Sequence, residues 1–382
     1  MDVVVVGGGI VGLASAYYLA GRGAAVTVLE KGSLGNGSTE RSAGGVRAQF
    51  STPVNVDLSL ASIPVWEAFE ETFGVDIAYR RPGYLFLARS EETAETFRAS
   101  VAMQQERGVP SELLTPEEAR DRCPELDPGP FRLATYSPTD GFTDPHLALQ
   151  GFSQAATDRG VDLRTKTPAT DVLRADGAVV GVEADGERID ADFVVNAAGP
   201  WAGRVAAMAG VDLPVVPKRR QVAVVDPETP VPAAVPLTID LDVGSYFRPE
   251  RDGAALVGGH FGGPDPAADP DAYARSFDLD WAADAVERAG DVAGYFGPDS
   301  RIRRGWAGLY AVTPDHHPVV EETVPGFVNA VGFSGHGYQH APATGQVVAE
   351  LVFDGAASTV DVSRLSSARF ERGDLIAERN VA

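Results

Sequence analysis

Three glycines and one acidic residue near the start of the chain have the types and spacing that bind a dinucleotide. Gly7, Gly9 and Gly12 follow a run of valines, and Glu30 closes the next apolar run. Gly7 permits a tight turn, Gly9 lets the backbone approach a pyrophosphate, and Gly12 lets a helix and a strand pack closely. The free N–H groups of the helix would face the phosphates, and the Glu30 carboxylate would accept from ribose hydroxyls. Because this acid repels a 2′-phosphate, the pattern favours FAD or NAD over NADP.

The elements that position these residues form a strand–turn–helix–strand unit. Apolar residues recur at helical spacing from Ile10 onward, and Gly21 and Gly23 end the helix. We expect a strand over 3–6, a helix over 10–21 and a strand over 26–30. The alternative is a glycine-rich turn without a ligand, but glycines, helix and acid all occur in the required order.

The chain is strongly acidic. It carries a net charge of −22 at pH 7, and its 32 basic residues include only three lysines, Lys31, Lys166 and Lys218. Such a charge argues against nucleic acids and anionic membranes as partners. The acidic, lysine-poor composition resembles that of haloarchaeal proteins. We therefore expect the fold to need molar salt, which screens the self-repulsion.

Length and cysteine content limit the architecture and the kinds of site. The chain has 382 residues, 44% of them hydrophobic, which is enough for two cores. No basic and apolar leader precedes the first strand and no apolar run reaches about 18 residues, so we expect a cytoplasmic protein without a membrane span. The single cysteine, Cys123, excludes an internal disulfide and a cysteine-rich metal site. Asp315, His316 and His317 are adjacent, but no second cluster completes a site, so no metal is expected.

Further along the chain, loops and short strands alternate with a few helices. A long loop over 32–50 precedes a helix near 53–73, and loops of that length are usually functional. Residues 214–262 alternate strands with Pro and Gly turns, which favours an antiparallel sheet. We expect a helix near 341–354, and a polar tail beyond residue 372 that frays.

Several motifs together resemble the D-amino-acid oxidase (DAO) superfamily of flavoproteins over nearly the whole chain. They are the dinucleotide turn, Gly37-Ser-Thr39, Ala43-Gly-Gly-Val-Arg47, Asn196-Ala-Ala-Gly-Pro-Trp201, Thr313-Pro-Asp315 and Gly332-Phe-Ser-Gly-His-Gly337. The chain is most similar to the branch of sarcosine oxidase β-subunits, dimethylglycine dehydrogenases and proline dehydrogenases. The resemblance implies an α/β fold with a doubly wound, Rossmann-like FAD-binding domain and an interleaved α+β substrate domain on a large antiparallel sheet. It implies an FAD domain over 1–78, 141–213 and 312–372, a substrate domain over 79–140 and 214–311, and a tail over 373–382.

The resemblance also implies which residues hold the FAD. Ser38 and Thr39 would bind the pyrophosphate, and residues 43–46 would pass along one face of the isoalloxazine. Residues 335–338 would cover the flavin near N1 and O2, where a helix N-terminus near 341 stabilises the anionic reduced flavin. The expected cofactor-binding residues are Gly7, Gly9, Ile10, Val11, Gly12, Glu30, Lys31, Ser38, Thr39, Ala43, Gly44, Gly45, Val46, Val172, Ala198, Gly199, Trp201, Gly308, Gly335, His336, Gly337 and Tyr338.

Five residues are candidates for the chemistry, which needs a neutral amine, a C–H bond near flavin N5 and a held carboxylate. The resemblance points to Arg47 as the carboxylate clamp; otherwise it is a surface or pyrophosphate arginine. It places Tyr246 and His260 in the active site, with His260 as the base for the amine or as a hydrogen-bonded core histidine. Arg248, on the same strand face as Tyr246, is an alternative carboxylate ligand or a solvated arginine. His336 is expected beside the flavin, with a turn histidine as the alternative.

Departures from the monomeric sarcosine oxidase pattern refine these expectations. Gly308 stands where those oxidases link FAD through a cysteine, so the FAD is expected to be non-covalent. Leu256 and Gln339 replace lysines of that pattern, the first of which is linked to oxygen activation. Without that cation a dehydrogenase is favoured over an oxidase. His146, near where β-subunits tether FMN, leaves a covalent link open.

The expected function is oxidation of the CH–NH bond of a small secondary amine or amino acid, such as sarcosine, dimethylglycine, proline or glycine. Hydride would move to flavin N5, and the resulting imine would hydrolyse. Electrons would pass to a quinone, a carrier, a partner subunit in a hetero-oligomer, or oxygen. The alternatives are a 2-hydroxy-acid dehydrogenase of the same fold and a non-enzymatic FAD-binding assembly factor for respiratory complexes. Trp306 and Tyr310 either line the site or pack in the core.

Overall fold

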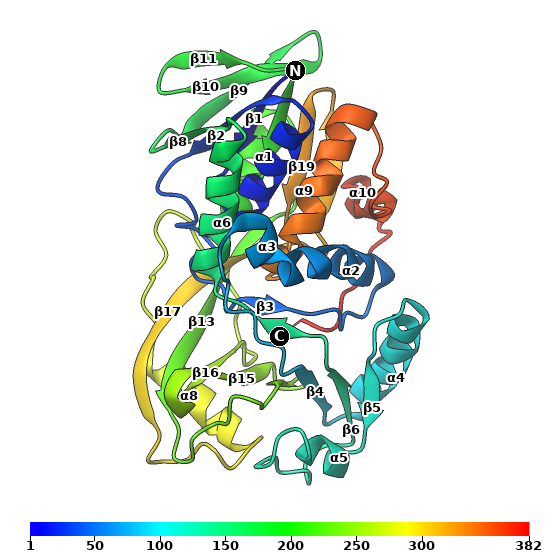
Figure 1. Ribbon diagram of the computed structural model, residues 1–382, viewed down its shortest axis with the longest axis vertical. Helices are drawn as coiled ribbons and strands as arrows, with labels where there is room; N and C mark the ends of the chain where they lie inside the picture. Colours follow the sequence, from blue (N-terminus) through cyan, green and yellow to red (C-terminus); the bar gives the residue numbers. More distant parts are fainter. Residues whose placement is uncertain (382) are drawn as a thin grey trace.

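The first layer is a six-stranded sheet that contains the strand preceding the glycine turn. A computed structural model describes residues 1–381. The strand order is β18–β19–β12–β1–β2–β8, with β18 antiparallel to β19 and the other neighbours parallel. Figure 1 labels β1, β2, β8 and β19 of this sheet. The strands are β1 (Asp2–Val6), β2 (Ala25–Glu30), β8 (Asp162–Thr165), β12 (Phe193–Asn196), β18 (Val319–Val324) and β19 (Phe327–Val331). This parallel arrangement brings the carboxyl ends of β1, β2 and β12 to one edge, where doubly wound folds bind ligands.

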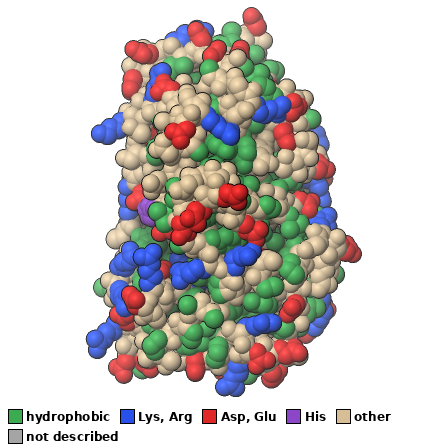
Figure 2. Space-filling model, in the orientation of Figure 1, with side chains coloured by type: hydrophobic (Ala, Val, Ile, Leu, Met, Phe, Trp, Pro, Cys, Tyr) green, Lys and Arg blue, Asp and Glu red, His purple; other side chains and the backbone are tan. Residues whose placement is uncertain are grey.

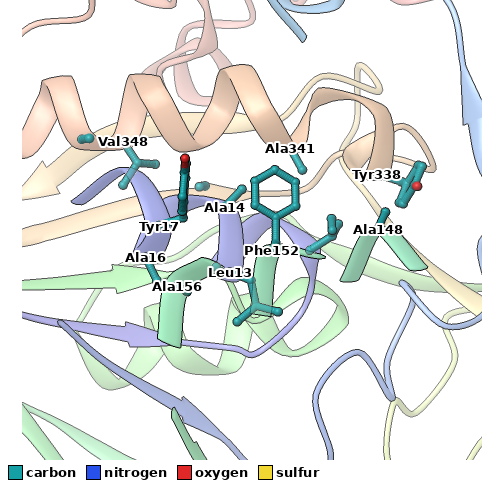
Figure 3. Close-up of a cluster of buried hydrophobic side chains, with 14 of the residues drawn as sticks. Leu13, Ala14, Ala16, Tyr17, Ala148, Phe152, Ala156, Tyr338, Ala341 and Val348 are labelled. Carbon is teal, nitrogen blue, oxygen red and sulfur yellow. The ribbon is translucent and has the colours of Figure 1, made fainter. Parts of the chain in front are cut away.

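Helices from distant parts of the chain pack on this sheet through small and aromatic side chains. They are α1 (Ile10–Gly21), α2 (Pro53–Glu67), α3 (Phe69–Phe73), α6 (Pro145–Asp158) and α9 (Gly337–Asp354). Figure 3 shows Leu13 and Ala14 of α1 among Phe152 of α6 and Ala341 and Val348 of α9. Close packing of this kind fixes where the N-termini of α1 and α9 lie.

The second layer is an eight-stranded sheet at the opposite end of the molecule from the N-terminus (Figure 1). Its order is β17–β13–β16–β15–β14–β4–β6–β5, and all neighbours are antiparallel except β14 and β4, which are parallel. The strands are β4 (Tyr84–Ala88), β5 (Glu112–Leu114), β6 (Leu133–Ser137), β13 (Val216–Asp226), β14 (Leu237–Asp240), β15 (Ser245–Pro249), β16 (Ala255–Gly259) and β17 (Arg301–Val312). Helices α4 (Glu91–Glu106), α5 (Pro116–Arg120) and α8 (Leu279–Gly290) accompany it.

Smaller elements complete the fold. An antiparallel sheet contains β9 (Ala169–Ala175), β10 (Ala178–Ala184) and β11 (Glu187–Asp190), and a two-stranded ladder joins β3 (Gly45–Val46) to β7 (Gly141–Phe142). The remaining α-helices are α7 (Ala202–Met208) and α10 (Ala368–Arg372). The α/β fold with its two kinds of layer agrees with the expected fold class. For the domain boundaries we propose the ranges given above, which assign the six-stranded sheet to the FAD domain and the eight-stranded sheet to the substrate domain.

Two local expectations need correction. Helix α9 begins at Gly337 rather than near 341, so His336 is its N-cap residue. The polar tail does not fray through its whole length, because Glu378 and Asn380 are 2% and 3% exposed. Polar composition predicted solvent exposure, but both side chains lie among polar partners from distant parts of the chain.

The surface carries charges of both signs. Figure 2 shows basic and acidic side chains interspersed over the visible face. Many form ion pairs, such as Arg22 with Asp354 and Arg219 with Asp278. Across residues 1–381, the helices include none with the length and apolar character needed to traverse a bilayer.

Candidate active site

A cavity of about 820 Å³ is lined by residues of both large sheets. Val6, Leu29 and Val331 contribute from the six-stranded sheet, and Val222 and Tyr246 contribute from the eight-stranded sheet. A volume of this size suits a large cofactor together with a small substrate.

At one end of the cavity, the glycine turn has the geometry that its residues predict. Gly7 has φ +117°, and a Cβ atom on Gly12 would lie 1.9 Å from the Gly7 carbonyl oxygen. Glu30 accepts hydrogen bonds from the Gly8 N–H at 2.9 Å and the Gly32 N–H at 2.7 Å. These bonds hold its carboxylate at the cavity wall, with lone pairs left for further donors.

These features fit the pyrophosphate and ribose of FAD. Gly9, the N-cap of α1, provides no side-chain cap, and Gly9, Ile10 and Val11 all line the cavity. Thr39 accepts from the Ile10 N–H at 3.1 Å, while the Ser38 hydroxyl donates to the Leu309 carbonyl at 2.6 Å. The N–H groups of the first turn that Thr39 does not engage, together with the helix dipole, attract phosphate.

Most of the expected cofactor residues line the cavity, and four do not. Those in its wall are Gly7, Gly9, Ile10, Val11, Glu30, Lys31, Ser38, Thr39, Ala43, Gly45, Ala198, Gly199, Trp201, Gly308, Gly335, His336, Gly337 and Tyr338. Gly12 packs against Gly7 instead, which is the packing role expected for it. Gly44, Val46 and Val172 also lie outside the wall, and Val46 and Val172 are core side chains, 1% and 3% exposed.

The loop that follows β16 closes the cavity beside the glycine turn. Asp271 of this loop lines the cavity, accepts from the Trp201 indole N–H at 2.9 Å and pairs with Lys31 and Arg204. The Lys31 ammonium lies 3.7 Å from the centre of the Trp201 ring. The Lys31 hydrogen bond, more than any other contact, holds the pKa of Asp271 down at about 2.

At the other end of the cavity, three tyrosines from three strands surround a small space. Tyr84, Tyr246 and Tyr310 come from β4, β15 and β17, and all line the cavity. Glycines make room for them: Cβ atoms on Gly45, Gly258 and Gly335 would lie 2.2 to 2.3 Å from their ring or hydroxyl atoms. Burial raises the pKa of all three phenols, so they are neutral hydrogen-bonding groups. Leu237 and Ile239 of β14 supply apolar wall between them.

Arg47 lies in the same part of the wall. Its guanidinium donates through Nη1 to the Gln49 carbonyl and through Nη2 to the Asn380 carbonyl, and its Cζ lies 3.8 Å from the centre of the Phe50 ring. Burial lowers its pKa, which the nearby Glu378 carboxylate opposes. An arginine remains charged despite such a shift. Among residues 1–381 no aspartate or glutamate forms an ion pair with this cation.

His336 lines the cavity, but both of its ring nitrogens are engaged. Nε2 lies 2.9 Å from the His316 carbonyl oxygen, and Nδ1 lies 3.3 Å from Nδ1 of His340. Because a carbonyl only accepts, His336 carries its proton on Nε2 and accepts at Nδ1 from His340. His340 then accepts at Nε2 from the Ser59 hydroxyl, 2.9 Å away. Burial lowers the pKa of His336 to about 3, so it is neutral and has no free lone pair for a substrate proton.

His260 and Arg248 lie outside this cavity wall, in contrast to Tyr246. Half-buried His260 stands 3.9 Å from Asp265, and burial lowers its pKa. Arg248 is 6% exposed, pairs with Glu250 at 3.2 Å, and lies over the Phe142 ring. Neither the expected base nor the alternative carboxylate ligand is therefore part of the cavity wall that the three tyrosines line.

Several wall residues were not anticipated from the sequence. Tyr84, Arg220, Asn380 and Val381 line the cavity, and His340 supports the wall through His336. Arg220 is bonded to Asp265 at 2.9 Å and lies two positions before Val222 on β13, so strand alternation aims both at the same side. That alternation is the one signal in the sequence that would have found Arg220.

The candidate tether His146 does not lie in the cavity wall, and a cysteine at Gly308 would be crowded. His146 is exposed at the start of α6, and Cys123 is fully buried in the core of the eight-stranded sheet. A Cβ atom at Gly308 would lie 2.8 Å from the Arg41 Cβ, so a cysteine there requires a shift. Within residues 1–381 no cluster of three His, Cys, Asp or Glu side chains is placed to hold a metal.

Known proteins are similar to this chain in sequence. The model of the DAO family, described as FAD dependent oxidoreductase, matches residues 2–351. FAD-dependent oxidoreductase domain-containing protein 1 of Xenopus laevis is 34% identical over 100% of this chain and 84% of its own length. Sarcosine oxidase subunit beta of Rhizobium meliloti (strain 1021) is 30% identical over 99% of this chain and 90% of its own length.

A solved structure shows that a known protein is also similar to this chain in fold. L-proline dehydrogenase from P. horikoshii superimposes with a TM-score of 0.88 at 34% identity, covering 98% of this chain and 99% of that protein. This agreement confirms the expected fold and FAD dependence. The chain belongs to the DAO family of FAD-dependent oxidoreductases.

Proposed function

We propose that this protein oxidises the CH–NH bond of a small secondary amine or amino acid that carries one carboxylate, and that it works as a dehydrogenase. FAD would occupy the cavity from the glycine turn to Tyr338, without a covalent link. The substrate would lie among Arg47 and the three tyrosines.

The observation that carries this proposal is the charge of Arg47. A buried cation is costly unless an anion compensates it. Arg47 lies in the cavity wall without an ion-pair partner among the described residues, so a substrate carboxylate would supply the missing charge. The phenols add neutral hydrogen-bond donors. The side chains of Leu237 and Ile239 would leave room only for a small apolar substituent on the substrate.

The residues around the substrate favour an amine over an alcohol. Oxidation of an alcohol needs a base for the hydroxyl proton. His336 has no free lone pair, and the tyrosines are neutral donors and acceptors. An amine instead loses its extra proton to water before it binds. This argument favours the amine over the 2-hydroxy acid.

The roles of the protein groups follow from this arrangement. Arg47 would hold the carboxylate, and the phenols would orient the neutral amine toward the face lined by Gly335 and His336. Bound FAD supplies the acceptor for the hydride that leaves the substrate carbon. As the C–H bond breaks, the nitrogen lone pair forms the C=N bond, and water then hydrolyses the imine.

The preference for dehydrogenase activity rests on Leu256. This side chain is 1% exposed and lies between apolar neighbours on β16, where the oxygen-activating pattern has a lysine. A cation stabilises developing superoxide, and an alkyl group does not. The electron acceptor would therefore be a quinone, a carrier or a partner subunit; one relative is itself named as a subunit of sarcosine oxidase.

The test is an anaerobic bleaching screen of the purified yellow protein in high salt. Sarcosine, dimethylglycine, proline, glycine, D-alanine and 2-hydroxyglutarate are added separately while the visible flavin band is recorded. Bleaching by an amine, with slow recovery in air, supports the proposal. Bleaching only by 2-hydroxyglutarate overturns the substrate class, and rapid recovery in air overturns the dehydrogenase assignment. Retained FAD without bleaching by any compound favours the assembly factor.

A further inference from the structure

The segment that follows α10 returns to the middle of the molecule, where Asn380 contacts Arg47 in the cavity wall. Figure 1 shows it running from α10 toward β3. Asn380 and Val381 of this segment line the cavity. We propose that Glu378 is a positioning residue that anchors this segment, so that the Asn380 carbonyl holds the Arg47 guanidinium in its carboxylate-binding orientation. This inference rests on the proposed function of Arg47.

The anchor is a fully engaged buried carboxylate. One oxygen of Glu378 accepts from the Ser51 N–H at 2.7 Å, the Ser51 hydroxyl at 2.6 Å and the Asn380 N–H at 3.0 Å. The other accepts from the Thr52 hydroxyl at 2.8 Å and the Asn55 amide at 3.0 Å. Bonds to a charged acceptor are the stronger kind, and together these hold the segment to residues 51–55.

The anchored segment reaches Arg47 through one backbone atom. The Asn380 carbonyl accepts from Nη2 of Arg47, and the Gln49 carbonyl accepts from Nη1. The Phe50 ring lies under the guanidinium plane. Two carbonyls and a ring fix a planar cation in position and orientation, which reduces the entropy that a ligand must overcome on binding.

Glu378 also places a negative charge near Arg47 without using the guanidinium donors that would bind the substrate carboxylate. It is the carboxylate that most strongly favours the charged form of Arg47, yet the two side chains form no ion pair. The negative charge therefore offsets part of the burial cost of the guanidinium. The donors of Arg47 that the two carbonyls do not use remain available for a substrate carboxylate.

Glu378→Gln tests the inference, because glutamine keeps the size of the side chain but places an NH₂ donor among donors. The control is Glu371→Gln, since Glu371 is exposed on α10 of the same region. The probes are pyrrole-2-carboxylate and its neutral counterpart pyrrole-2-carboxamide, titrated against the visible spectrum of the bound flavin. We expect Glu378→Gln to weaken carboxylate binding about tenfold or more while leaving carboxamide binding and FAD content unchanged. Glu371→Gln should behave as the unmodified protein does.

A double variant separates positioning from a general structural effect. In the Arg47→Met background, Glu378→Gln should cause no further loss of carboxylate binding, because the group that it positions is gone. Wild-type carboxylate binding by Glu378→Gln overturns the inference, as does an additional loss in the double variant. If the unmodified protein binds both probes equally, the proposed function fails instead.

Ser51→Ala covers the case in which Glu378→Gln does not fold. This change removes one hydroxyl that donates to Glu378 and accepts from the Arg379 N–H at 2.8 Å. A selective loss of carboxylate binding of about threefold or more supports the inference. An equal loss for carboxylate and carboxamide overturns it.

Discussion

Arg47→Met should weaken carboxylate recognition by about 10- to 150-fold. Methionine fills similar space over the Phe50 ring but donates no hydrogen bond. A hydrogen bond to a charged group contributes about 1.5–3 kcal/mol, and about 1.4 kcal/mol corresponds to a tenfold change in affinity. Because the guanidinium is only 8% exposed, solvent provides little substitute for it, and we expect the upper half of this range.

The assay measures kcat and KM for the amine that bleaches the flavin, together with the Kd of pyrrole-2-carboxylate from the flavin spectrum. The loss should appear mainly in KM and Kd, with FAD content unchanged. Arg248→Met is the matched control, because Arg248 is equally buried at 6% but pairs with Glu250 outside the cavity wall. Loss of FAD before loss of carboxylate affinity would refute the role of Arg47. A larger Kd effect from Arg248→Met would transfer the clamp to that residue.

Three further outcomes are expected. The value of kcat/KM should rise with pH through the pKa of the substrate amine and shift when the amine is changed; an inflection near 6.5 that is common to all substrates would contradict the neutral state of His336, whose pKa burial lowers to about 3. Burial raises the pKa of Asp140 from 3.8 to about 6, so its stabilising contribution is complete below pH 3.8 and is lost as pH rises through about 6. Asp140→Asn should therefore lessen the fall in the free energy of unfolding between pH 5 and pH 8 by about 1 kcal/mol, as measured by denaturant titration at both pH values; an unchanged pH dependence would refute this reasoning. Because the net charge is −22, the melting temperature should rise from 0.1 to 2 M KCl, and equal stability in both would remove the halophile hypothesis.

The dinucleotide end was predictable because its parts are close in sequence. Gly7, Gly12 and Glu30 belong to one strand–helix–strand unit, and local spacing alone sets their relative positions. The acid at the end of β2 accepts hydrogen bonds from the N–H groups of Gly8 and Gly32, which hold its carboxylate at the cavity wall. The motif therefore predicted both the fold of this part of the chain and the cofactor.

The end of the cavity that the three tyrosines line was only partly predictable, because its residues come from strands far apart in the chain. Alternation placed Tyr246 and Arg248 on one strand face but did not say where along that face the cavity ends. Arg248 lies two residues after Tyr246 on β15, over the ring of Phe142. His260 follows the last paired residue of β16, so the sheet register no longer fixes its direction.

His340 and Asn380 were invisible to sequence reasoning for another reason. His340 acts through the ring nitrogen that contacts His336, and Asn380 acts through the direction of its backbone carbonyl. Residue type and spacing encode neither feature. The Asn380 side chain suggested an exposed tail, whereas its backbone oxygen makes the contact with Arg47.

The bond between Ser51 and Glu378 also sets an order of assembly. These residues are 327 positions apart, so the contact forms only after residue 378 has been synthesised. The strands and helices around the glycine turn are complete once α9, which ends at Asp354, has been made. A chain interrupted between these points would retain the elements that bind FAD but lack the carbonyl that holds Arg47. Yellow colour would then report cofactor binding in a partial product, and only substrate turnover would report that synthesis had reached residue 380.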